Sequence, residues 1–89
     1  MVKIEMKKFG KVLNSRPAAK EAVLRVKQIA NGTEGDMVLD FSEVDILTPS
    51  FADEFVKGLK GIYPNKKIDF QGIEQNEIIK ETLKAVNAI

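Results

Sequence analysis

The sequence predicts an α/β protein in which a central, mostly parallel or mixed sheet of about four strands carries three packed helices. Three observations lead to this prediction. Segments with apolar residues at alternate positions take turns along the chain with segments of helical spacing. Each candidate helix has one apolar face. The length of 89 residues leaves room for one hydrophobic core, so we expect a single domain over residues 1–89.

The first half of the chain predicts two strands and a helix. Apolar and polar residues alternate over residues 2–6, as in a half-exposed strand, and residues 11–15 can add a short second strand. Ser15 is a good N-cap, and Pro17 fits the first turn of the following helix. Gly32 is a good stop signal for that helix.

The second half continues the alternation. The nearly unbroken apolar run over residues 36–41 predicts a central strand that is covered on both faces. Residues 42–49 form a connection with an extended piece of their own, and a helix follows over residues 50–62. We expect another strand over residues 67–71 and a final helix over residues 75–89.

The helix expected over residues 50–62 combines an apolar stripe with two glycines. Gly58 and Gly61 would allow this helix to approach the sheet closely. The stripe that we expect to be buried consists of Phe51, Phe55, Val56, Leu59 and Ile62.

Composition excludes several kinds of site. The chain has no cysteine and no histidine, which removes disulfides, thiolate metal sites and the commonest general base. The net charge of +1 does not favour nucleic acid, so we expect no nucleic-acid partner. No apolar run is long enough to span a membrane, and residues 1–10 lack the apolar core of a secretion signal. We therefore expect a cytoplasmic protein that needs no cofactor.

The stretch LTPSFADEF, residues 47–55, is the most informative in the sequence. Ser50 precedes Asp53 by three residues, a near-match to the capping box, in which the serine hydroxyl accepts a hydrogen bond from the first turn. Such a cap contributes roughly 1 kcal/mol and needs no further function. Serine caps are common, so residue physics alone favours the interpretation of Ser50 as a cap.

A functional interpretation uses the same position. A serine at the start of a helix, beyond the end of a central strand, is where α/β proteins place functional groups. Phosphorylation of Ser50 would add a charge of about −1.5 to −2. Because Asp45, Asp53 and Glu54 lie nearby in the sequence, this charge would strengthen a negative surface and repel a docked partner.

At these residues the sequence resembles a known family. The segment MVLDFSEVDILTPSFADEFVKGL, residues 37–59, is similar to the central motif of the STAS-like domains of unknown function, relatives of bacterial anti-sigma factor antagonists. The resemblance extends in pattern over residues 9–86 and is specific over residues 40–59. It implies a STAS-like fold and a regulatory protein–protein interaction. The equivalent serine of the antagonists opens the second helix and is phosphorylated by a kinase of the histidine-kinase-like ATPase fold.

By position, the resemblance assigns that serine to Ser50 as a candidate phosphosite. Thr48 and Pro49 stand where the antagonists usually have Asp and Ser, and Phe51 replaces a glycine. The implied partner is a histidine-kinase-like ATPase or anti-sigma-type kinase. The sequence leaves the oligomeric state open between a monomer and a weak dimer. The candidate partner-binding residues around Ser50 are Asp45, Thr48, Pro49, Phe51, Asp53 and Glu54.

Two alternatives stay open. In the first, the chain is a constitutive adaptor or scaffold in which Ser50 is only a cap. In the second, the carboxylates of Asp40, Asp45 and Asp53 bind Mg²⁺ in a small enzyme. The absence of His, Cys and a glycine-rich phosphate loop argues against the enzyme, so we expect no catalytic activity and no catalytic or metal-binding residues.

Overall fold

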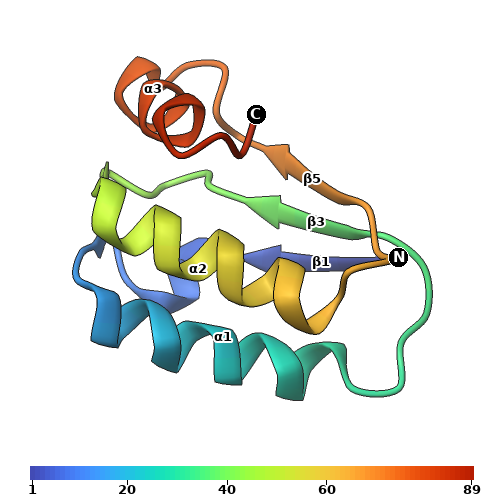
Figure 1. Cartoon of the computed structure of the whole chain (residues 1–89). Coiled ribbons are helices and arrows are strands. Elements are labelled where there is room, and N and C mark those ends of the chain that lie inside the picture. Colours follow the sequence, from blue (N-terminus) through green and yellow to red (C-terminus); the bar gives the residue numbers. More distant parts are fainter.

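The computed structural model describes all 89 residues, and its elements follow the predicted order (Figure 1). Every predicted helix and strand is present, with a short 3-10 helix, η1, in addition. Their bounds are β1 Val2–Glu5, η1 Met6–Phe9, β2 Val12–Leu13, α1 Arg16–Ala30, β3 Met37–Asp40, β4 Ile46–Leu47, α2 Pro49–Ile62, β5 Ile68–Gln71 and α3 Glu77–Ala85.

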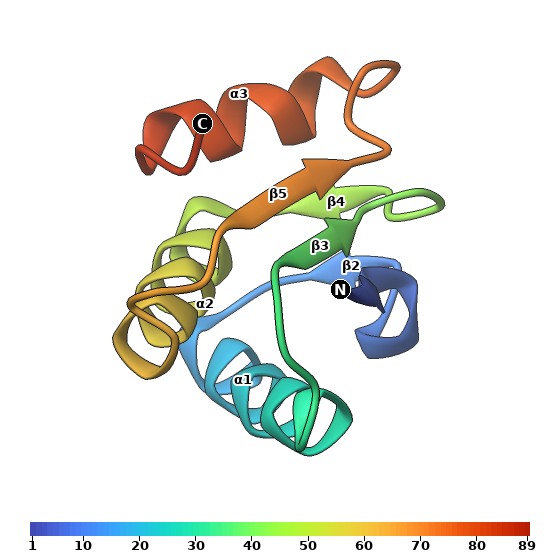
Figure 2. The same ribbon diagram turned by 90° about the vertical axis from the view of Figure 1, so that its right-hand side faces the viewer.

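All strand pairs are parallel, and the strands form two sheets. The larger sheet has the order β1-β3-β5, and the smaller one pairs β2 with β4. Since β1 leads into β2 and β3 leads into β4, the smaller sheet continues the β1–β3 pair beyond an interruption (Figure 2). The prediction of about four strands is thus close to the five observed. No helix is long and apolar enough to cross a membrane.

One face of the larger sheet is apolar and carries the core. In-register pairing places side chains of neighbouring strands on the same face. The helices α1 and α2 pack against this face and against each other, and α3 lies alongside β5 and contacts α2 and β4 (Figures 1 and 2). The apolar face consists of Val2, Ile4, Met37, Leu39, Ile68 and Phe70.

The opposite face of the sheet is polar, so the prediction that residues 36–41 are covered on both faces was wrong. The strand order advances in one direction, from β1 to β3 to β5, and right-handed crossovers then return each helix to the same face. Lys3 and Asp40 form an ion pair of 3.5 Å on the uncovered face. Its other residues from the three strands are Glu5, Val38, Asp69 and Gln71.

The two glycines of α2 do not approach the sheet, contrary to the prediction. A Cβ atom at Gly58 would lie 3.0 Å from Cγ2 of Val23, so this glycine allows α2 to pack closely on α1. Gly61 has no neighbouring atom within 4 Å of such a Cβ. Four residues of the predicted stripe are buried, whereas Ile62 is 40% exposed at the end of the helix.

Candidate functional site

Helix α2 begins directly after β4, and Thr48 is its N-cap. Thr48 has extended backbone angles, and its Oγ1 accepts a hydrogen bond from the Phe51 amide at 3.3 Å. Pro49 occupies the first helical position, where its missing N–H costs nothing. The interpretation of Ser50 as the cap of a capping box was therefore wrong by two positions. The proline determines the helix start, and the residue before it supplies the cap.

The side chain of Ser50 is left free for other uses. Ser50 is exposed in the first turn of α2, and its hydroxyl forms no hydrogen bond within the chain. Pro49 is exposed beside it, and Asp45 is exposed just before β4. We call these three residues, together with the half-buried Asp53 and Glu54, the α2 entry face.

Phe51 does not belong to this face, although it was a candidate partner-binding residue. Its side chain is 1% exposed and stacks on Phe55 with ring centroids 5.6 Å apart. Thr48 is half-buried, and its hydroxyl is occupied by the cap. Both residues therefore support the α2 entry face from beneath.

Two cations pair with Asp53 and Glu54 on the α2 entry face, whereas Asp45 has no ion-pair partner, so the face is less negative than its sequence suggests. Nη1 of Arg16, at the start of α1, lies 2.9 Å from Oδ2 of Asp53 and 3.6 Å from Oε1 of Glu54. Nζ of Lys57 lies 3.0 Å from Oδ1 of Asp53. Hydrogen bonds from Arg16 and then from Lys57 hold the pKa of Asp53 below its ordinary value. Arg16 of α1 therefore links the two helices through its ion pairs with residues of α2.

An exposed apolar pair on the small sheet escaped sequence reasoning. Val12 of β2 and Ile46 of β4 are cross-strand partners, 56% and 46% exposed. Their neighbours Leu13 and Leu47 are also paired and are buried. Each short strand consists of two consecutive apolar residues, so its sequence does not show which one is exposed, and only the pairing shows that the two exposed side chains lie together.

The three carboxylates considered as Mg²⁺ ligands do not form a common site. Asp40 Oδ1 accepts hydrogen bonds from the Ser42 hydroxyl at 2.7 Å and the Ser42 amide at 3.0 Å, and these bonds lower the pKa of Asp40. Asp53 is paired with Arg16, and Asp45 stands apart on the surface. No group of three or more Asp or Glu side chains is placed to hold a metal ion. The geometry therefore gives the Mg²⁺ hypothesis no support.

The turn that contains Asp40 and Ser42 has a structural role. The turn after β3 packs against Gly72, which follows β5 with φ of 76°. A Cβ atom at Gly72 would lie 2.5 Å from the Ser42 Oγ and 2.7 Å from the Asp40 Oδ1. This contact joins the carboxyl ends of β3 and β5. A neighbouring hollow of about 400 Å³ is lined mainly by the polar loop residues that follow these two strands.

Comparison with known proteins gives one match. The sequence model of the STAS-like domains of unknown function matches residues 21–78, which include most of α1 and all of β3, β4, α2 and β5. Neither the curated proteins nor the solved structures give a match. The matched range covers well over half of the chain and contains the motif on which the resemblance was based. The chain therefore belongs to the family of STAS-like domains of unknown function.

Proposed function

We propose that this protein is a regulatory interaction module that docks on a histidine-kinase-like ATPase or serine kinase through the α2 entry face. Phosphorylation of Ser50 would switch the docking. The observation that carries the proposal is the free Ser50 hydroxyl. Because Thr48 supplies the cap, the exposure of Ser50 has no structural explanation in the helix start.

The ion pairs of Asp53 and Glu54 support the proposed switch. Ser50 stands three and four residues before Asp53 and Glu54, which places the three side chains on one side of the helix. Arg16 and Lys57 together offset the charges of these two carboxylates. A phosphate on Ser50 would add a charge of about −1.5 to −2 and compete with them for the guanidinium. The face would become more strongly negative, and a partner fitted to the unphosphorylated state would be repelled.

A test uses capture of partners from the native cell with immobilised wild type, Ser50→Ala and Ser50→Asp, read by mass spectrometry. Aspartate is favourable in the first turn of a helix, so Ser50→Asp should fold normally. Gln28→Glu, an exposed change of the same charge on α1, is the control. The proposal predicts an ATPase of the histidine-kinase-like fold on every bait except Ser50→Asp. If such a protein is retained equally by all four baits, the alternative of a constitutive adaptor holds.

A further inference from the structure

An apolar pocket of about 230 Å³ opens between η1, β2 and the first half of α1. Six of its lining residues are apolar, namely Phe9, Val12, Leu13, Ala18, Ala22 and Phe51. Small-molecule sites usually enclose about 300–1,000 Å³, so this pocket has the size for one large side chain. Its floor is rigid because Leu13 and Phe51 are 1% exposed and Ala22 is 3% exposed.

Arg25, at the rim of the pocket, is placed to bind a carboxylate. The guanidinium of Arg25 lies 5.0 Å from the centroid of the Phe9 ring. Stacking on the ring holds the guanidinium in place. Arg25 forms no ion pair with Glu21, which lines the same pocket one helical turn earlier. Its donors are therefore free for a bidentate bond to a carboxylate.

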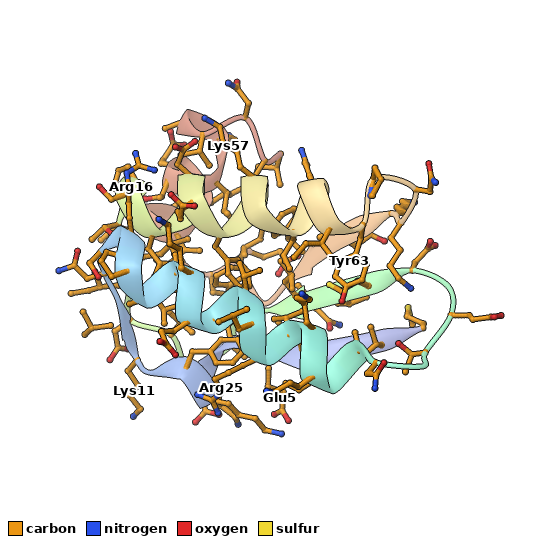
Figure 3. All side chains as sticks on the ribbon, turned by 60° about the horizontal axis from the view of Figure 1, so that its bottom comes forward. Glu5, Lys11, Arg16, Arg25, Lys57 and Tyr63 are labelled. Carbon is orange, nitrogen blue, oxygen red and sulfur yellow. The ribbon has the colours of Figure 1, made fainter.

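A second free cation, Lys11, lies beside the pocket. Lys11 is exposed next to Val12 and forms no ion pair within the chain. Figure 3 shows Lys11 and Arg25 on the same side of α1, the side away from α2. The lining itself holds one cation, Arg25, and one acidic residue, Glu21, so Lys11 gives the surroundings of the pocket a net positive charge, which favours an occupant of negative charge.

The pocket is continuous with surfaces already described. Phe51 lies in its floor and directly follows Ser50 in the sequence. Val12 lines the pocket and also forms the exposed pair with Ile46. A partner lying across this end of the molecule could therefore reach both the pocket and the α2 entry face.

We infer that this pocket receives a large apolar side chain from an acidic segment of a partner protein, with an adjacent Asp or Glu of that segment bonded to Arg25. The inference rests on the proposed function in assigning the pocket to a partner protein, and it adds the chemistry of that partner. An apolar anchor in a pocket with charges at its rim is the usual form of an interaction hot spot.

The test uses a displayed library of random peptides of about 12 residues, long enough for an anchor and its flanking charges. Selection is made on the wild type, and binding is then measured on variants. Ala18→Phe fills the pocket from an exposed helix position, and Arg25→Glu reverses the rim charge. Leu24→Phe, on the same helix and 55% exposed outside the pocket, is the matched control.

We expect the selected peptides to share an apolar residue next to Asp or Glu and to bind each pocket variant at least about tenfold more weakly, a difference of about 1.4 kcal/mol. Binding to Leu24→Phe should equal that of the wild type. Failure to enrich such peptides, or equal binding to Ala18→Phe, would overturn the inference.

Two further measurements separate the possible failures. Sedimentation of the protein alone tests whether a second copy of the chain is the occupant. Such a copy would offer Ile78 of α3 as the inserted side chain, since Ile78 is 67% exposed and is flanked by Glu77 and Glu81. A mass above the monomer that Ala18→Phe abolishes would overturn the assignment to a different protein. The selected peptides should also bind Ser50→Asp as they bind the wild type. The pocket would then stand even if the phosphorylation switch fails.

Discussion

The Oγ1 atom of Thr48 accepts a hydrogen bond from the amide of Phe51 at 3.3 Å, and this bond releases Ser50 from the task of capping α2. Thr48 Oγ1 also donates to the Leu13 carbonyl at 3.4 Å, which ties the helix start to β2. The same residue thus fixes the helix and its place on the small sheet. The availability of Ser50 depends on this arrangement.

The assignment of the cap predicts different effects on stability for substitutions at Thr48 and Ser50. Thr48→Ala should lower the free energy of unfolding by about 1 kcal/mol, because it removes the cap acceptor. Ser50→Ala should change it by less than about 0.5 kcal/mol, as expected for a surface position without a bond. Urea unfolding measures both values, with Thr48→Ser as the control that retains the acceptor. A larger loss for Ser50→Ala than for Thr48→Ala would contradict the assignment of the cap.

Gly72→Ala should be strongly destabilising. The new Cβ would clash with the Asp40 and Ser42 side chains at a residue whose φ is 76°, so we expect a loss of more than about 2 kcal/mol. Gly32→Ala is the matched control, because Gly32 has a φ of 78° and no atom within 4 Å of such a Cβ. It should show the backbone strain alone, about 1 kcal/mol. Equal losses in thermal unfolding would mean that the contact between the two loops is unimportant.

The two glycines of α2 should also behave differently. Gly61→Ala should stabilise the protein by up to about 1 kcal/mol, since alanine is the better helix former and the site is open. Gly58→Ala brings a methyl group to 3.0 Å from Val23 Cγ2 and forces α1 and α2 apart. We expect it to be less stable than Gly61→Ala by at least about 1 kcal/mol. The same gain for both substitutions would show that the helices are not packed as closely as described.

Stability should fall in acid because several carboxylates have lowered pKa values. Bonds from the Ser42 hydroxyl and amide lower the pKa of Asp40, and a bond from Lys7 lowers that of Glu43. Their contribution is therefore complete above the ordinary pKa of about 4 and is lost as the pH falls through the folded values. The melting temperature should drop steeply below about pH 4. Asp40→Asn should flatten this drop, whereas parallel curves for the two proteins would contradict the role of the Asp40 charge.

The order of the elements could be predicted from the sequence because strand alternation, helical spacing and stop signals are local. Whether β3 is covered on one face or on both could not be predicted, since a nearly unbroken apolar run such as residues 36–41 fits either arrangement. The strand order decides between them, and it depends on tertiary pairing. The same limit applies to Gly58. A glycine within the helix predicted a close approach to another element, but only the structure shows that this element is α1, at Val23.

The start of α2, where the candidate site lies, was predictable in its location and not in its details. Proline at position 49 marked the helix start, and with it the position of Ser50. The cap shifted to Thr48 because a proline takes the first helical position. The pairing of Arg16 with Asp53 joins residues 37 positions apart in the chain, so no local pattern shows it.

The most direct test of the account is the affinity of the captured ATPase for the wild type, Ser50→Ala and Ser50→Asp, measured by titration calorimetry. We predict that Ser50→Ala binds as the wild type does and that Ser50→Asp binds at least about tenfold more weakly, because its charge stands beside Asp53 and Glu54. Equal affinities for the three proteins would contradict the role of Ser50 as the switch of the α2 entry face.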